Sequence, residues 1–209
     1  ALKTTGQRPI ARMAELGVLN PNSQCVHMTQ IDDADLEQVV RSGTHVVHCP
    51  ESNLKLASGF CPVPQLMERG VNVTMGTDGA ASNNDLDLFG ELQTAAMVAK
   101  AVSGDASAVS AHQALAMATI NGAQALGLEH EIGSLVAGKR ADLIAVDLGD
   151  PFIQPVYDPA SHLVYSNHGR AVSHSWINGV PQLQDGRLTR IDVPDLMLRV
   201  DHWRQQIIS

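Results

Sequence analysis

The sequence predicts an α/β fold in which helices cover both faces of a parallel sheet. Three short stretches, 23–27, 44–48 and 71–77, have the apolar and β-branched content of strands. Helix-like segments separate them, so strands and helices alternate along the chain. Only 3% of the residues are aromatic, whereas 44% are hydrophobic. The core is therefore expected to be aliphatic, as in strands that are buried on both faces.

The helices of this first region are indicated by their ends and their periodicity. Segment 32–41 places acids in its first turn and a base near its last, as the helix dipole favours. After a long loop, segment 63–69 is expected to form a short helix closed by Gly70. Two longer helices, with apolar residues recurring about every 3.6 positions, are predicted over 87–102 and 111–126.

Past these helices the pattern changes to short strands separated by glycine and proline turns. Strands are predicted over 141–147, 162–165 and 172–179. The last of them ends in Asn178-Gly179, a pair that favours the tight turn of a hairpin. An amphipathic helix is expected over 195–208.

Each of the three strands in the first region ends at a polar residue. His27 closes the first, His48 closes the second, and Asp78 follows the third. Ligands and catalytic groups gather at the carboxyl ends of parallel strands, so we expect these three residues on one rim. Imidazole and carboxylate are ligands that zinc accepts, and a divalent metal makes water a nucleophile near neutral pH. The three residue types therefore suit a metal site.

These residues also have structural interpretations, which the sequence alone leaves open. Thr77-Asp78-Gly79 has the composition of a turn, since Asp-Gly pairs start turns and tolerate unusual backbone angles. In the same interpretation the His48 ring braces the loop that begins at Cys49-Pro50. A dinucleotide-binding fold is disfavoured, because no GxGxxG motif follows any strand.

Composition and charge argue against several classes of function. The net charge is −8 and no basic cluster occurs, which argues against a nucleic-acid partner. No signal peptide is visible, and no apolar run approaches the roughly 20 residues of a membrane span. Cys25, Cys49 and Cys61 form no CxxC pair, which is typical of a reduced, cytoplasmic protein.

Four segments, taken together, resemble the later motifs of the amidohydrolase superfamily. They occur in the family's order and lie at 27–30, 48–59, 76–84 and 133–143. The resemblance extends from about Arg8 to the C-terminus. It is greatest with the branch that holds 5-methylthioadenosine/S-adenosylhomocysteine deaminases, guanine deaminases and triazine hydrolases.

The resemblance implies the C-terminal part of a metal-dependent (β/α)8 TIM barrel with a small β-sandwich appendage. Residues 1–130 would supply the last strand–helix units, 131–192 part of the sandwich, and 193–209 a C-terminal helix. A complete barrel takes roughly 250 residues. The family's first-strand HxH pair and its fifth-strand histidine and glutamate do not occur in this sequence. This chain alone is therefore expected to be inactive.

By the same resemblance, Asp78 is implied as a metal ligand that also takes a proton from the attacking water. His27 is implied to hydrogen-bond that water or the developing oxyanion, a contact worth ~3 kcal/mol in the transition state. His48 and Asn53 are implied to organise Asp78 without touching the metal. Ser82 is implied to lie in the substrate loop. The expected metal is zinc, or another divalent metal such as iron.

The reaction that the resemblance implies for the full-length enzyme is hydrolytic deamination of a purine nucleoside. The adenine amino group of 5-methylthioadenosine or S-adenosylhomocysteine would become the inosine oxygen, with release of ammonia. Segments 80–82 and 85–87 are most similar to this branch. The alternatives are a guanine or chlorotriazine hydrolase, or an inert, incomplete chain without metal. The inert chain would have open strand edges, which another polypeptide or the partner copy of a homodimer would cover.

Overall fold

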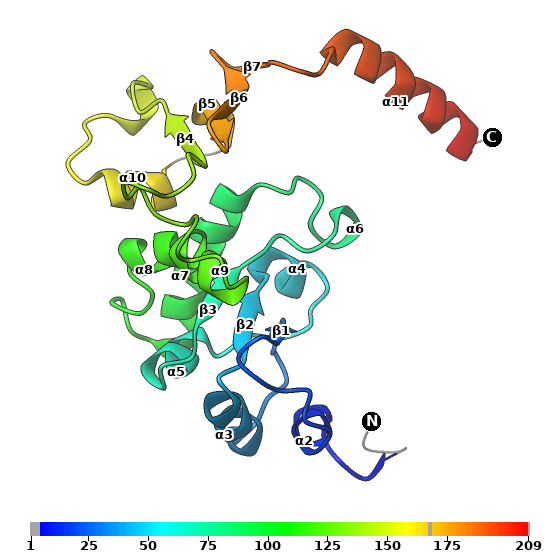
Figure 1. Cartoon of the computed structure of the whole chain (residues 1–209), viewed down its shortest axis with the longest axis vertical. Helices are drawn as coiled ribbons and strands as arrows, with labels where there is room; N and C mark the ends of the chain where they lie inside the picture. The colour runs from blue at the N-terminus through cyan, green and yellow to red at the C-terminus, as the bar shows by residue number, and fades with distance from the viewer. Residues whose placement is uncertain (1–4, 167–168, 209) are drawn as a thin grey trace.

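The computed structural model describes residues 5–166 and 169–208. The first region is built around a three-stranded parallel sheet, which Figure 1 shows at the centre of the chain. The strands are hydrogen-bonded in sequence order: β1 (Gln24–Val26), β2 (His45–His48) and β3 (Val73–Met75). The predicted parallel sheet, with helices between its strands, is confirmed.

Helices precede, separate and follow these strands. α3 begins at a capping box, in which the side chains of Asp32 and Asp35 each accept the other residue's backbone N–H, and it ends at Gly43 in the left-handed conformation. These caps explain why the end signals in the sequence locate this helix. The helices of this region are α2 (Pro9–Glu15), α3 (Asp33–Ser42), α4 (Pro50–Lys55), α5 (Val63–Glu68), α6 (Ala80–Asn83), α7 (Leu88–Ser103), α8 (Ala111–Met117) and α9 (Ile120–Ala125).

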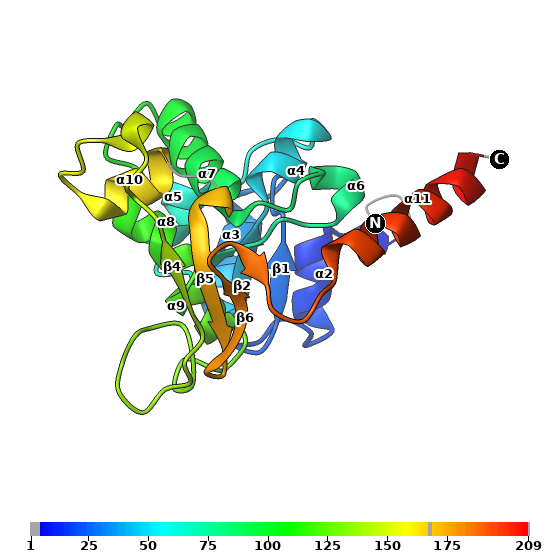
Figure 2. The ribbon, with the colours of Figure 1, turned by 90° about the horizontal axis from the view of Figure 1, so that it is seen from above.

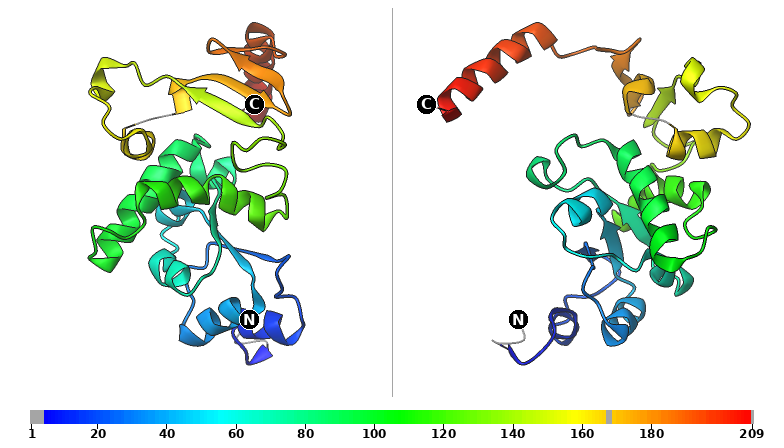
Figure 3. Two further views of the ribbon diagram at one scale, coloured as in Figure 1. Left: turned by 60° about the vertical axis from the view of Figure 1, so that its left-hand side comes forward. Right: turned by 180° about the vertical axis from the view of Figure 1, so that it is seen from behind.

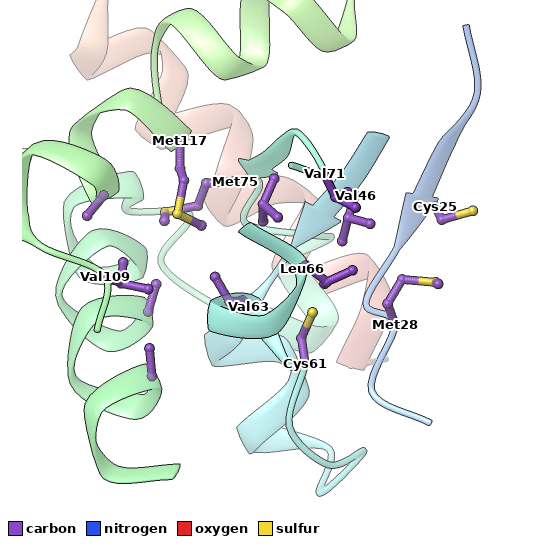
Figure 4. Close-up of a cluster of buried hydrophobic side chains, with 14 of the residues drawn as sticks. Cys25, Met28, Val46, Cys61, Val63, Leu66, Val71, Met75, Val109 and Met117 are labelled. Atoms are coloured by element: carbon purple, nitrogen blue, oxygen red, sulfur yellow. The ribbon is translucent and has the colours of Figure 1, made fainter. Parts of the chain in front are cut away.

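The core lies between the parallel sheet and these helices. In the strand register Val46 of β2 is flanked by Cys25 of β1 and Val73 of β3, and all three side chains are buried. Leu66 of α5 and Met117 of α8 are fully buried in the same cluster, part of which is drawn in Figure 4. The core is thus aliphatic and sulfur-containing, as the composition predicts.

A second, antiparallel sheet follows. Its strands pair in the order β4 (Leu143–Val146), β5 (Val172–Ile177), β6 (Val180–Gln184) and β7 (Arg187–Leu188), and Figure 2 shows the first three side by side. Asn178 and Gly179 join β5 to β6 with φ angles of 50° and 76°. The predicted hairpin turn is therefore confirmed, since both residues adopt the left-handed conformation that such turns require.

Three predictions from the sequence were wrong. The expected long loop after His48 contains the helix α4. The expected strand over 162–165 is part of the helix α10 (Pro159–Tyr165), which packs against α7 and α8. The single helix predicted over 111–126 is two helices, because Thr119 between them has φ −130° and ψ −95°.

The last element, α11 (Val193–Ile208), confirms the predicted terminal helix, although it begins two residues earlier. None of its residues is buried, and in Figures 1 and 3 it stands apart from the two sheets. Short 3-10 turns, η1 (Pro151–Ile153) and η2 (Gly169–Ala171), complete the described elements. In the part of the chain that the structure describes, no helix has the length and apolar content to cross a membrane.

Candidate active site

The parallel sheet brings polar residues to one rim. His27 directly follows β1, His48 is the last residue of β2, and Asp78 lies three residues beyond β3. Because the strands are parallel, all three residues lie at the carboxyl end of the sheet, which confirms their predicted placement. The Nε2 atom of His27 lies 3.8 Å from Oδ2 of Asp78. These two side chains therefore come within reach of one small molecule or ion.

Both of these residues have a left-handed backbone conformation, with φ of 71° at His27 and 64° at Asp78. For residues other than glycine this conformation costs about 1–2 kcal/mol. The His27 N–H donates to Val47 O at 3.0 Å, which extends the β1–β2 pairing into the turn. The Gly79 N–H donates to Asp78 Oδ1 at 2.8 Å. Strained residues that their surroundings hold in place concentrate at functional sites.

Three donors hold the Asp78 carboxylate. Ser52 Oγ and Ser82 Oγ each donate to Oδ2 at 2.7 Å, and the Gly79 N–H donates to Oδ1. These hydrogen bonds, led by the one from Ser52, lower the pKa of Asp78 to about 2, although burial acts in the opposite direction. Asp78 is therefore ionised at neutral pH and suited to binding a cation.

Asn53 orients the His27 ring. The two side chains meet at 2.8 Å, where His27 Nδ1 donates to the amide oxygen Oδ1 of Asn53. In the neutral ring, Nε2 is then an acceptor or a metal ligand, and only the doubly protonated ring donates from Nε2. The sequence predicts that Asn53 supports Asp78, whereas the hydrogen bond in the structure is to His27.

His48 lies behind the rim. Its side chain is 3% exposed, and burial, followed by repulsion from His27, lowers its pKa to about 4. The ring is therefore neutral near pH 7. Its backbone carbonyl accepts the Gly76 N–H at 3.0 Å, which fixes the end of β3 beside β2. The ring also lines a cavity of about 10 Å³ together with Asn53, a space too small for a heterocycle.

The sequence profile of the Amidohydrolase family matches residues 2–181. This chain belongs to the amidohydrolase family. Two curated relatives bear the name 5-methylthioadenosine/S-adenosylhomocysteine deaminase: the protein of Teredinibacter turnerae is 50% identical over 207 residues, and that of Saccharophagus degradans is 48% identical over 202 residues. The matches cover 99% and 97% of this chain but 47% and 45% of the relatives. The chain thus spans about half the length of the curated relatives it matches.

Two solved structures have a fold similar to that of this chain. A structure from Xanthomonas campestris, described as an adenosine deaminase with bound zinc, has a TM-score of 0.96 and 47% identity, and the match covers 99% of this chain and 47% of that one. Atrazine chlorohydrolase TrzN from Arthrobacter aurescens, complexed with zinc, has a TM-score of 0.90 and 23% identity over 96% of this chain and 45% of its own. At that identity the second match shows the fold alone.

The structure of this amidohydrolase chain adds supports that the sequence did not reveal. Ser52 contacts Asp78 directly, and Lys55 Nζ links α4 to α6 by donating to Ala81 O at 2.9 Å. Serine is common near helix starts, so its type and position gave no signal of a contact with Asp78. Ser82, which the family resemblance places in the substrate loop, also donates to Asp78.

The donor atoms at the rim fit part of a metal site. Asp78 and His27 are of residue types that zinc accepts, and their donor atoms are 3.8 Å apart. Oδ1 of Asp78 accepts one hydrogen bond from a backbone N–H, and its second lone pair is available to a cation. Among the described residues, no group of three His, Cys, Asp or Glu side chains could hold a metal ion.

Proposed function

We propose that a full-length protein containing this chain hydrolytically deaminates 5-methylthioadenosine and S-adenosylhomocysteine. The observation that carries the proposal is the ionised Asp78 carboxylate facing the oriented His27 ring at the rim of a parallel sheet. Relatives about 50% identical over nearly the whole chain bear that name, which supports this substrate class. The chlorohydrolase, at 23% identity, supports only the fold, so a chlorotriazine is the less favoured substrate.

The proposed reaction adds water at the adenine carbon that carries the amino group. A C–O bond forms and the C–N bond breaks. One proton of the water goes to the amino nitrogen, which leaves as ammonia with the bonding electron pair, and the other proton ends on the adjacent ring nitrogen of the product. A zinc ion, or another divalent metal such as iron, supplies Lewis acidity that makes water nucleophilic near neutral pH. In this chain Asp78 would hold such an ion through its carboxylate.

Two further tasks fall to the residues at the rim. Asp78 would receive the proton of the attacking water and pass it to the leaving nitrogen, which a carboxylate with a pKa of about 2 does only transiently. His27 would donate from Nε2 to the oxygen on which charge develops. Because its Nδ1 donates to Asn53, this role requires the doubly protonated ring.

We also infer the finer architecture. Residues 1–130 would form the last strand–helix units of a (β/α)8 barrel, 131–192 part of a β-sandwich, and 193–209 a terminal helix. The TM-scores of 0.96 and 0.90 support this assignment. β1 pairs with β2 alone among the described strands and leaves Val26 47% exposed, as expected of a strand whose other neighbour lies elsewhere. Three free, buried cysteines support a reducing, cytoplasmic location.

The test is a substrate comparison with the full-length protein, followed as absorbance change with methylthioadenosine, guanine and a chlorotriazine. We expect deamination of methylthioadenosine, and its loss in Asp78→Asn, because an amide offers neither the negative charge nor the proton acceptor. Asp105→Asn, which changes an exposed acid outside the rim, is the matched control. Turnover of only another heterocycle would replace the substrate class, and near-normal turnover in Asp78→Asn would refute the site.

A further inference from the structure

A buried acid joins the two segments that support Asp78. Glu91 of α7 is 0% exposed. Its Oε2 accepts the Glu51 backbone N–H at 3.1 Å, and its Oε1 accepts the Asn83 Nδ2 donor at 2.8 Å. Glu51 lies in the first turn of α4, and Asn83 is the last residue of α6. One carboxylate therefore anchors the start of one short helix and the end of another.

Each of these anchors is adjacent in sequence to a serine that holds Asp78. Ser52 follows Glu51, and Ser82 precedes Asn83. Both hydroxyl groups donate to the same carboxylate oxygen, Oδ2, at 2.7 Å. The direction of the Asp78 carboxylate thus depends on where α4 and α6 lie relative to each other.

A second acid completes this network. Glu51 Oε2 accepts Asn83 Nδ2 at 3.2 Å, and its Oε1 accepts Thr94 Oγ1 at 3.0 Å. Asn83 Oδ1 accepts the Leu86 N–H at 2.6 Å, so the orientation of this amide is fixed. A Cβ at Gly90 would lie 3.0 Å from Glu51 Oε1, so the glycine makes room for the acid. A buried polar network with every member satisfied holds its surroundings rigidly.

We propose that Glu91 is a positioning residue for the Asp78 carboxylate and acts through α4 and α6. The inference rests on the proposed function, because it concerns the same site. Well-packed apolar side chains often replace buried ion pairs without loss of stability, so burial of a charged group does not by itself stabilise a protein. An apolar side chain at position 91 would accept neither of the two hydrogen bonds that fix α4 relative to α6. We therefore explain the acid at this position by its effect on the separation of the two serines.

Glu91→Gln is the smallest change that tests the network. The new amide oxygen can still accept the Glu51 N–H, but the new amide nitrogen then faces the Asn83 amide nitrogen, and two donors meet. Asn83 cannot turn over, because its oxygen holds the Leu86 N–H. We expect kcat for methylthioadenosine, measured above about pH 8 where Glu91 is ionised, to fall about 10- to 100-fold with little change in KM, since a small displacement of a catalytic group has an effect of this size.

A variant with reversed polarity is the matched rescue: Glu51→Gln, Asn83→Asp and Glu91→Gln combined. The new carboxylate at position 83 accepts from both new amides and from the Leu86 N–H. The amide oxygens at positions 51 and 91 still accept from Thr94 and from the backbone of position 51. Every hydrogen bond is kept with its polarity reversed where needed, so a positioning role predicts recovery of kcat. The double variant without Asn83→Asp should not recover.

Hydrogen exchange, measured on the same full-length proteins, reports whether α6 is held in place and does not depend on enzymatic activity. The N–H groups of Ser82, Asn83 and Asn84 donate to carbonyls at the start of α6. We expect their protection to fall at least about tenfold in Glu91→Gln and to return in the triple variant, while Leu36 in α3 stays unchanged. Wild-type protein that does not deaminate methylthioadenosine would refute the proposed function, yet this exchange comparison would still decide the positioning role.

Two results would overturn the proposal. One is a Glu91→Gln protein with the exchange and kcat of the wild type. The other is a triple variant as impaired as the single one, which would show that the charge of Glu91 matters rather than its hydrogen bonds. If Glu91→Gln does not fold, the triple variant decides alone: native exchange and kcat support the positioning role, and their loss refutes it.

Discussion

Asp78 remains charged because three hydrogen bonds lower its pKa, and the three donors come from different parts of the chain. Ser52 lies on α4, Ser82 lies on α6, and Gly79 directly follows Asp78 in the sequence. His27 is oriented separately, through Asn53. The two groups that face each other at 3.8 Å are therefore held by different side chains, although Ser52 and Asn53 are neighbours on α4. Replacing His27 or Asp78 itself leaves the hydrogen bonds of the other group in place, so their roles can be separated by substitution.

We predict different metal contents for two substitutions in the full-length protein. Asp78→Asn should lose most of its zinc, because the site loses a charged ligand. His27→Asn should slow deamination strongly yet keep most of the metal, because its proposed role is to donate a hydrogen bond. Zinc content after dialysis and deamination rate are measured on the same samples. If His27→Asn loses its metal as fully as Asp78→Asn, His27 is a metal ligand and the assignment of roles is wrong.

The sequence reveals the residues at the rim but not the residues that support them. His27, His48 and Asp78 were predictable, since each comes at the end of an apolar run and strand ends share one rim. Ser52 and Glu91 were not, because their roles depend on which segments become neighbours in space. A serine near a helix start and an acid inside a helix have no local signature.

At the scale of elements, end signals proved more reliable than apolar runs. Asp158 caps α10 and Pro159 is its first residue. These start signals favour a helix more strongly than residues 162–165 favour the strand that was predicted there. The break between α8 and α9 has a tertiary cause: Thr74 Oγ1 of β3 donates to Met117 O at 2.9 Å, and Asn121 Nδ2 donates to Val73 O at 2.9 Å. Sequence periodicity cannot reveal a helix that ends because a neighbouring strand binds it.

The link between α9 and the second sheet gives a prediction at this scale. A Cβ at Gly133 would lie 2.6 Å from Ala123 Cβ and 3.0 Å from Ile120 Cα, and φ there is 85°. Gly138 has φ 96° but no atom within 4 Å of such a Cβ. We expect Gly138→Ala to cost about 1–2 kcal/mol from backbone strain alone, and Gly133→Ala to cost clearly more, since it adds an overpacking cost of about 1–3 kcal/mol. Urea unfolding measures both, and equal costs would show that the close contact is unimportant.

At the scale of the whole molecule, two buried groups make the stability of the chain depend on pH in opposite ways. Burial, followed by repulsion from Glu51, raises the pKa of Glu91 to about 7, although the Glu51 N–H opposes the shift. Its contribution to stability is present below the ordinary pKa of 4.5 and is lost as pH rises through 7. His48, whose pKa falls from 6.5 to about 4, contributes above pH 6.5 and loses its contribution as pH falls through 4.

The two effects oppose each other between about pH 4.5 and 6.5, and each amounts to roughly 3 kcal/mol. We therefore predict a nearly flat free energy of unfolding in this range, measured by urea titration at several pH values. Glu91→Gln removes the Glu91 titration without adding another acid and should expose the His48 effect, so that stability falls steadily as pH is lowered from 6.5 to 4. A Glu91→Gln protein with the flat profile of the wild type would mean that His48 does not titrate as its burial implies.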